Sequence, residues 1–442
     1  MSKVGSLSRQ DEALVQQARA ILTLNWTGAY TQPGPRLYPH QWSWDSALIA
    51  IAYAHYEVGR AEKELRHLFE AQWSNGLLPQ IVFNPRFRDY FPGPSFWNAK
   101  ESPHAPKRYE TSGVVLPPVH ATAVRAIHNA AGEDARDFLE YAFRKLKAWH
   151  DYLYRDRDPR GEGLVYIRHP WESGMDNSPI WDFIMQRMHL RAGQIPKYQR
   201  ADTHAVSAQD RPTSAAYDRF AYLVKFFADR SYDEARIRED CPFLVQDVLF
   251  NSLLCRSEKD MAALASVLGE DSTPFEERSQ KTARAIEQKL WDEERGIYLD
   301  YDLVGNRPIR VYFAANFSPL FAGIPDEAKA KKLVDALNND GFGLSDENVT
   351  PVPSYDVHGF GFSPVEYWRG PVWLNINWFL MHGLEDYGYR EHADRLRDTI
   401  VELCRREGFH EYFDPITGQG HGSDLFSWSA ALLIDVLANK KA

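Results

Sequence analysis

Apolar residues recur at helical spacing along most of the chain. The first such pattern follows Ser8, a good N-cap residue, and consists of Leu14, Val15, Ala18, Ile21 and Leu22. Further helices are predicted over residues 45–55, 61–73, 119–131, 133–154, 217–229, 245–268, 274–291, 326–337, 373–384, 390–406 and 425–438. The pattern therefore predicts about a dozen helices in succession.

Strand signals are few. Residues 296–302 and 308–313 flank a turn at Gly305-Asn306 and predict one β-hairpin. Strands do not alternate with helices, which argues against a Rossmann fold or a TIM barrel. The sequence predicts an all-α protein, and we expect an (α/α)6 barrel, or toroid, built from concentric helical hairpins. A generic all-α bundle is the simpler alternative.

Three long stretches lack periodicity, at residues 73–118, 155–216 and 344–372. They are rich in Trp, Tyr, Pro and Gly, so ordered lids are expected rather than disorder. No linker divides the chain. We therefore expect residues 1–442 to form a single catalytic domain, with lid insertions at approximately 73–118 and 155–216.

The composition narrows the function classes. With 51 Lys and Arg against 61 Asp and Glu residues, the formal net charge is −10. This excludes a general nucleic-acid binder and disfavours docking to anionic lipid. The three cysteines have no disulfide or zinc spacing, residues 1–10 lack a signal-peptide core, and no apolar run could span a membrane. We expect a cytoplasmic protein, and a homo-oligomer remains open.

Several common site motifs are missing. The sequence has no GxSxG, P-loop, HExxH or EF-hand loop, and its histidines are scattered. No cofactor and no metal ion are therefore expected. The acidic residues of segment 292–302 offer the one place for a structural calcium ion.

Two loops combine carboxylates with aromatic residues. Asp176 lies in the turn-rich segment 169–179, where the simpler interpretation is a helix cap or Asx turn. Glu411 lies in segment 408–418, where the simpler interpretation is an exposed loop acid. Two loop carboxylates framed by aromatic rings fit glycoside hydrolysis, in which one protonates the leaving oxygen and the other activates water or attacks carbon.

Eight blocks of the sequence resemble glycoside hydrolase family 63. The similarity is greatest to its small bacterial members, the glucosylglycerate and mannosylglycerate hydrolases. The blocks are YPHQWSWD (38–45), QWSNGLLP (72–79), YFPGP (90–94), WESGMDNSP (171–179), YQRAD (198–202), RP with YDR (211–219), YWRGPVW (367–373) and EYF (411–413). They extend from about residue 25 to the C-terminus in family order.

The resemblance implies an (α/α)6 barrel with a lid and an inverting exo-α-glycosidase acting on a small soluble glucoside or mannoside. It implies that Asp176 is the general acid and Glu411 the general base. A small carbohydrate is then the partner, with Arg211 and Tyr217 holding a glycerate carboxylate and Tyr90 reaching down from the lid. The other implied substrate-binding residues are Tyr38, Trp42, Trp44, Asp45, Gln80, Trp171, Gly174, Tyr367, Trp368, Trp373 and Trp428.

Departures from the glucosylglycerate-type pattern leave the chemical identity of the aglycone open. Leu116 replaces a Gln, Gln80 replaces a His, and Leu425-Phe426 replaces a Gln pair. An α-glucosidase acting on a neutral di- or oligosaccharide is therefore the main alternative. A sugar epimerase, with His40, His169 or His410 as acid and base, is a remote one.

Overall fold

The computed structural model describes residues 7–191, 193–200, 202–339, 341–345 and 348–439. The expectations above that concern residues 1–6, 192, 201, 346–347 and 440–442 fall outside these ranges. Within them, no helix combines the length and the apolar character that crossing a membrane requires.

Within the described ranges, six helical segments form a closed inner ring. Each packs on the next in the order α2, α5, α11, η6, α14 and α16, and α16 packs again on α2. Their bounds are Ser43–Ala54, His120–Ala131, Val248–Leu268, Ala314–Leu320, Leu374–Asp386 and Ser427–Ala438. Every residue of α2 is buried, as expected for a helix with neighbours on all sides.

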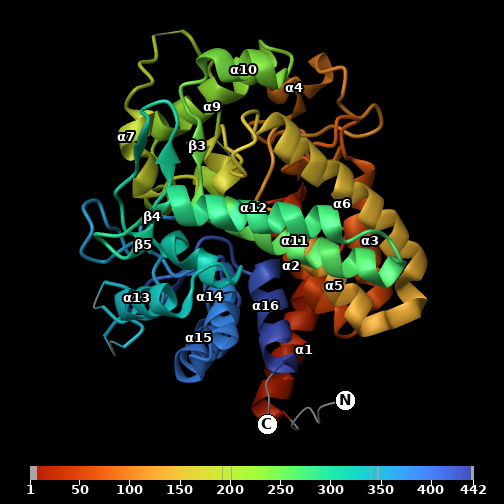
Figure 1. Ribbon diagram of the computed structural model, residues 1–442, viewed down its shortest axis with the longest axis vertical. Helices are drawn as coiled ribbons and strands as arrows, with labels where there is room; N and C mark the ends of the chain where they lie inside the picture. Colours follow the sequence, from red (N-terminus) through yellow and green to blue (C-terminus); the bar gives the residue numbers. More distant parts are fainter. Residues whose placement is uncertain (1–6, 192, 201, 340, 346–347, 440–442) are drawn as a thin grey trace.

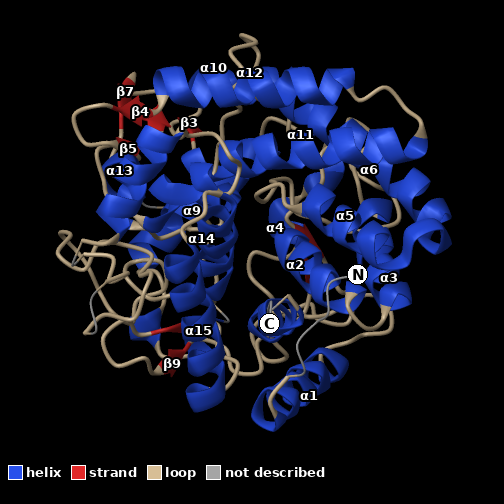
Figure 2. Ribbon diagram, turned by 60° about the horizontal axis from the view of Figure 1, so that its bottom comes forward, coloured by secondary structure: helices blue, strands red, loops and turns tan. Residues whose placement is uncertain are grey.

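A second ring of helices surrounds the first (Figure 2). These helices are α1 (Arg9–Leu24), α3 (Val58–Glu70), α6 (Arg136–Asp156), α12 (Thr273–Lys289), α13 (Glu327–Leu337) and α15 (Arg390–Glu407). They are amphipathic: α6, for example, buries one stripe that includes Phe138, Ala142, Leu146 and Leu153. Two concentric helical rings confirm the predicted (α/α)6 barrel.

The inner helix η6 was not predicted. It is a 3₁₀ helix of seven residues that contains Pro319. So short a segment gives no helical repeat, and proline normally argues against a helix interior. The flanking helices α11 and α14, which the periodicity did predict, hold it in place.

The segments 73–118 and 155–216, together called the cap, lie over one end of the barrel with α9 and α10 (Figure 1). Their secondary structure is sparse because most of each segment is loop. The helices in this region are α4 (Pro94–Trp97), α7 (Asp182–Met185), α8 (Asp202–Ala205), α9 (Ser214–Ala228) and α10 (Glu234–Asp240), and the 3₁₀ helices are η1 (Ala99–Glu101), η3 (Pro170–Ser173), η4 (Pro179–Trp181) and η5 (Ala208–Asp210). One more 3₁₀ turn, η2 (Gly132–Ala135), joins α5 to α6.

The described strands are two residues long and pair antiparallel. They are β1 (Gln41–Trp42) with β2 (Ile81–Val82), β3 (Val245–Gln246) with β6 (Tyr301–Asp302), β6 with β7 (Arg307–Pro308), β4 (Trp291–Asp292) with β5 (Ile297–Tyr298), and β8 (Tyr412–Phe413) with β9 (Gly420–His421). The predicted hairpin is thus only partly correct. Residues 301–302 do pair with 307–308, but residues 297–298 turn back to 291–292 instead.

The acidic residues of segment 292–302 do not surround a common position that could hold an ion. Asp292 accepts a hydrogen bond from the Arg295 amide, and Asp302 pairs with Arg187 at 2.8 Å. Asp300 accepts from the Val248 amide at the start of α11. Among the described residues, no group of three His, Cys, Asp or Glu side chains is arranged to hold a metal ion. The structure therefore gives no support to a calcium site here.

Candidate active site

One cavity, of about 110 Å³, lies at the cap end of the inner ring. Helices α2, α14 and α16 begin beside it, so the residues just before each helix, or in its first turn, face the cavity. All sixteen residues singled out from the sequence line this one space. The sequence reasoning did not assign Pro33, Leu37, Ile81, Phe91, Pro92, Asp202 and Pro212, which also line it, nor give a role to Leu116 and Phe426.

Glu411 is held firmly on one wall. The Tyr38 hydroxyl donates to its Oε1 at 2.5 Å, and the Ser423 amide donates to its Oε2 at 2.9 Å. The Arg211 Nη1 lies 3.5 Å from Oε1. Burial raises the pKa of Glu411, while the Arg211 charge and these hydrogen bonds work against the rise. The contacts therefore favour the ionised form and fix its orientation.

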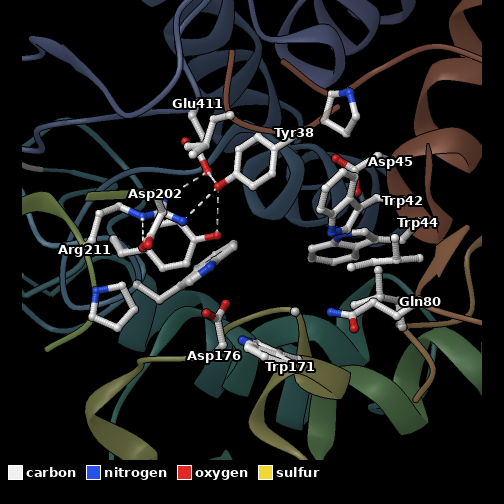
Figure 3. A pocket seen from close by; sticks show the side chains of 18 of the residues that line it. Tyr38, Trp42, Trp44, Asp45, Gln80, Trp171, Asp176, Asp202, Arg211 and Glu411 are labelled. Carbon is white, nitrogen blue, oxygen red and sulfur yellow. Dashed lines mark hydrogen bonds and ion pairs between the residues drawn. The ribbon is translucent and has the colours of Figure 1, made fainter. Parts of the chain in front are cut away.

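Asp176 lies on the opposite wall (Figure 3). It follows the 3₁₀ helix η3 and Gly174, which adopts φ +73° and lies so close to Trp44 that a Cβ atom would come within 2.5 Å of the indole. Burial raises the pKa of Asp176 to about 7, against the lowering effect of the Arg211 charge. Two carboxyl groups thus face one cavity in different electrostatic environments, which is the arrangement of an acid and base pair.

Arg211 connects the cap to Glu411. Its Nη2 donates to the Tyr38 hydroxyl at 3.0 Å, its Nε donates to Asp202 at 3.3 Å, and its guanidinium lies 4.1 Å above the Tyr367 ring. Its Nη1 is buried and has no hydrogen-bond partner within the described part of the chain. Nη1 therefore meets Glu411 as an ion pair at 3.5 Å without a hydrogen bond, and the arginine as a whole lines the cavity.

Arg200 supports Arg211 from outside the cavity. It forms a bidentate pair with Asp202, at 3.0 and 2.6 Å, and donates to the Pro212 carbonyl at 2.6 Å. Arg211 thus pairs with Asp202, whereas the nearby Asp218 accepts from Tyr198.

The two cap segments meet beside Tyr217. Its hydroxyl donates to the Phe91 carbonyl at 3.1 Å. The Phe91 ring stacks on Tyr198 at a centroid distance of 4.2 Å. Since residue 91 belongs to one cap segment and residue 198 to the other, these contacts join the two segments over the cavity.

Aromatic rings and one further carboxyl group complete the wall. Trp368 and Trp373 stack at 3.7 Å between centroids, and Trp44 meets Trp428 edge-on at 5.4 Å. Asp45, in the first turn of α2, is buried, and burial raises its pKa to about 8. Flat apolar faces beside a carboxyl group suit a sugar ring, whose faces are apolar and whose edges carry hydroxyls.

The departures from the family pattern divide into two groups. Leu116, Gln80 and Phe426 line the cavity, whereas Leu425 does not and offers its backbone carbonyl to Asn25 at 2.8 Å. The Gln80 Oε1 is buried and unpartnered among the described residues. The wall is therefore apolar at two of these positions and polar at one.

The three histidines weighed for an epimerase do not line the cavity. His40 Nδ1 accepts from the Asn84 amide, and His169 contacts the Phe220 carbonyl and the Trp171 amide. Burial lowers the pKa of His410. The epimerase interpretation therefore fails, because no imidazole is found among the described residues that line the site.

Glu172 also lies outside the cavity, although it is only four residues from Asp176. Its carboxylate is fully buried and receives both terminal nitrogens of Arg157, at 3.0 and 2.9 Å. The backbone amides of Arg168 and Val115 donate to it at 2.7 and 3.2 Å. Because residue 115 belongs to one cap segment and residues 157–172 to the other, Glu172 ties the two segments together.

The chain is similar to known glycoside hydrolases over nearly its whole length. A family model described as "Mannosylglycerate hydrolase MGH1-like glycoside hydrolase domain" matches residues 38–429. A mannosylglycerate hydrolase from Rubrobacter radiotolerans is 65% identical over 96% of this chain and 97% of its own length. A glucosylglycerate hydrolase from Mycolicibacterium hassiacum is 34% identical over 96% of this chain and 97% of its own.

A solved structure is also similar over nearly the whole chain. It is the family 63 mannosylglycerate hydrolase from Thermus thermophilus in complex with Tris and D-glycerate, with a TM-score of 0.89 and 42% identity, and the match covers 96% of this chain and 99% of that one. Sequence, fold and cavity lead to one conclusion: the chain belongs to the MGH1-like glycoside hydrolases of family 63.

Proposed function

We propose that this protein is an inverting exo-α-glycosidase that hydrolyses mannosylglycerate, with Asp176 as general acid and Glu411 as general base. The observation that carries the proposal is the pair of carboxyl groups on opposite walls, with the Arg211 guanidinium in an ion pair with Glu411 at 3.5 Å beside the same cavity. The names of the relatives, and the D-glycerate bound by the Thermus structure, support the substrate. Mannose is favoured over glucose because the mannosylglycerate hydrolase is much more similar to this chain.

In this mechanism the Asp176 carboxyl group gives its proton to the glycosidic oxygen. Glu411 takes a proton from a water molecule as that water attacks the anomeric carbon from the opposite face. Asp45, Gln80 and the aromatic wall hold the sugar, and Arg211 and Tyr217 hold the carboxylate of the aglycone. An arginine fork matches a carboxylate in shape and charge.

We also propose that residues 1–442 form one catalytic domain covered by the cap segments. The stacking of Phe91 on Tyr198 and the contact of Glu172 with Val115 support this, since each joins residues of both segments. A cytoplasmic location fits the three cysteines, which are free and buried.

An inverting reaction has a direct chemical signature. The mannose first released from an α-mannoside is expected to be the β-anomer, because water attacks from the face opposite the leaving group. One-dimensional proton NMR during the first minutes of turnover separates the two anomers before mutarotation mixes them. Initial release of the α-anomer would instead indicate retention and a covalent intermediate.

Arg211→Ala is expected to raise KM for mannosylglycerate by about tenfold to a hundredfold, since a charge-assisted bidentate contact contributes that much. KM for a neutral α-disaccharide is expected to rise far less. The matched control is Arg200→Ala, which removes another buried partner of Asp202 but does not line the cavity. Steady-state kinetics on both substrates provide the measurement.

Equal losses on both substrates would contradict glycerate as the aglycone. They would favour the second candidate function, an α-glycosidase acting on a neutral disaccharide. The apolar side chains of Leu116 and Phe426 on the cavity wall favour that alternative.

The pH dependence follows from the two carboxyl groups. We expect kcat/KM to fall as pH rises through about 7, because burial raises the pKa of Asp176 to about 7 and only its protonated form is an acid. On the acidic side, kcat/KM falls as Glu411 takes up a proton and stops acting as a base. Rates measured from about pH 4 to pH 9 test this bell shape.

A control substrate separates the two limbs of the profile. The fluoride of α-mannosyl fluoride leaves without protonation, so its hydrolysis needs the base but not the acid. The alkaline limb is therefore expected to disappear with this substrate, while the acidic limb stays. An alkaline limb of equal size with both substrates would contradict the role of Asp176.

A further inference from the structure

A single basic residue, Arg211, is found among the described residues that line the active-site cavity. The carboxyl groups on the same wall are those of Asp45, Asp176, Asp202 and Glu411. The catalytic pair makes opposite demands on the cation, because Glu411 must stay ionised to act as a base whereas Asp176 must stay protonated to act as an acid. A positive charge favours the ionised form of both. The charge of Arg211 must therefore act on the base more strongly than on the acid.

The guanidinium of Arg211 is turned towards Glu411. Its Nη1 lies 3.5 Å from Glu411 Oε1. Its Nη2 donates to the Tyr38 hydroxyl at 3.0 Å, and this hydroxyl donates to the same Oε1 at 2.5 Å. Asp176 lies on the opposite wall of the cavity (Figure 3). The base therefore meets the cation directly and through one hydroxyl group, while the acid faces it across the cavity.

Asp202 holds the other edge of this guanidinium. The Arg211 Nε donates to Asp202 Oδ2 at 3.3 Å, and because a guanidinium is planar and rigid, holding Nε sets the direction of both η nitrogens. Arg200 fixes the Asp202 carboxylate from outside the cavity through its bidentate pair at 3.0 and 2.6 Å. Burial alone would raise the pKa of Asp202, but the hydrogen bonds from Arg200 and the charge of Arg211 lower it. Asp202 is therefore an ionised partner that does not turn.

The charge of Asp202 also reduces the effect of Arg211 on Asp176. The field of an ion pair falls off faster with distance than the field of a lone charge. A carboxylate in contact with the guanidinium therefore experiences most of its charge, whereas a group across the cavity experiences much less. In agreement, burial raises the pKa of Asp176, the Arg211 charge lowers it, and the Asp202 charge raises it again.

The other titratable groups around Asp176 do not produce this difference between acid and base. Burial raises the pKa of Asp45 to about 8, so this group is largely uncharged at neutral pH. Burial also raises the pKa of the tyrosines on the cavity wall, which are Tyr38, Tyr90, Tyr217 and Tyr367. Behind Asp176, Asp182 and Arg369 neutralise each other through two hydrogen bonds of 2.8 Å, and Glu366 and Arg219 line the same space with opposite charges.

We propose that Asp202 is a positioning residue for the catalytic pair: it turns the Arg211 guanidinium towards Glu411 and offsets the charge of Arg211 at Asp176. One cation then keeps the base ionised without weakening the acid. Residues 200, 202 and 211 belong to the cap segment 155–216, whereas Tyr38 and Glu411 lie outside the cap, so the cap brings this arrangement of charges to the base. The inference rests on the proposed roles of Asp176 and Glu411.

Asp202→Asn removes the charge and keeps the size of the side chain. If Asp202 contributed charge alone, its loss would lower the pKa of both catalytic carboxyl groups, and both limbs of the pH profile of kcat/KM would move to lower pH. If it also turns Arg211, Glu411 loses its cation and the acidic limb moves to higher pH, while the alkaline limb still moves to lower pH. We expect the two limbs to approach each other, each by about half a pH unit.

Arg200→Gln is the matched control, because it removes a charge beside Asp202 but leaves the pair of Asp202 with Arg211 and does not line the cavity. It is expected to move both limbs in the same direction, to higher pH. The profiles are measured with mannosylglycerate from about pH 4 to pH 9. The position of a limb does not depend on the concentration of folded enzyme. Asp202→Ser, which leaves room for water between the two arginines, is expected to narrow the profile as well and replaces Asp202→Asn if that variant does not fold.

Limbs that move in parallel in the Asp202 variant, or that do not move, would overturn the positioning role. With α-mannosyl fluoride, whose hydrolysis needs no acid, only the upward shift of the acidic limb is expected to remain. An acidic limb that stays in place with this substrate would also overturn it, because Arg211 would then keep its contact with Glu411 without Asp202. A wild type that does not hydrolyse mannosylglycerate would instead refute the proposed function.

Discussion

Asp176→Asn and Glu411→Gln are each expected to lower kcat on mannosylglycerate by about 10²- to 10⁴-fold or more, the usual contribution of a positioned acid or base. Each change keeps the size of the side chain but removes its proton transfer. Both variants are expected to fold and to bind mannose nearly as the wild type does. Rates are measured by mannose release, and binding by calorimetry.

The two variants are expected to differ with α-mannosyl fluoride. Because fluoride needs no proton to leave, Asp176→Asn should hydrolyse this substrate at close to the wild-type rate. Glu411→Gln should remain inactive, since water still needs its base. If both variants were equally inactive on α-mannosyl fluoride, Asp176 would not be the general acid. Substantial activity of either variant on mannosylglycerate would contradict the assignment of both residues.

Glu172→Gln is the natural control for these rates. Glu172 lies in the same aromatic segment as Asp176 but does not line the cavity. Turnover per folded molecule is expected to change much less than in the two variants above. This comparison separates the loss of proton transfer at Asp176 from any loss of turnover that a substitution elsewhere in the same segment would cause.

The residues of the site could be predicted better than their contacts. Each predicted site residue lies beside a helix start or within a turn-rich loop, and short motifs of this kind are visible along the chain. The two carboxylate partners of Arg211 are different: Asp202 is nine residues away and Glu411 is 200 residues away. Sequence spacing carries no information on which carboxylate an arginine meets after such a long loop closes.

The same contrast holds for the fold: helices could be predicted from the apolar pattern, whereas features set by individual contacts could not. The helices α2, α11 and α14 were predicted within a few residues, because apolar residues recur over three or more turns of each. The start of α11 was placed at residue 245 rather than 248, since the capping role of Asp247 is local hydrogen bonding that periodicity does not show. Helix η6 escaped prediction because its stability comes from neighbours and not from its own sequence.

Glu172→Gln is expected to lower the free energy of unfolding by about 3–5 kcal/mol, the cost of removing one partner from a buried ion pair. The charges of Arg157 and Arg168 hold the pKa of Glu172 below its usual value in spite of complete burial. Arg157 and Arg168 also share Glu234, at 3.0 and 3.1 Å. Without the Glu172 carboxylate, two buried guanidinium groups would compete for that single carboxylate.

The wild type and Glu172→Gln are unfolded in urea at pH 7, and unfolding is monitored by intrinsic fluorescence. Glu133→Gln is the matched control, because Glu133 pairs with Arg136 at an exposed position and is expected to cost less than about 1 kcal/mol. Since the folded-state pKa of Glu172 is lowered, its contribution is complete above its unfolded pKa and is lost as pH falls. The difference between wild type and Glu172→Gln should therefore narrow below about pH 4. A loss no larger than that of Glu133→Gln would mean that the two cap segments are held together by their other contacts, such as Phe91 with Tyr198, and not by this carboxylate.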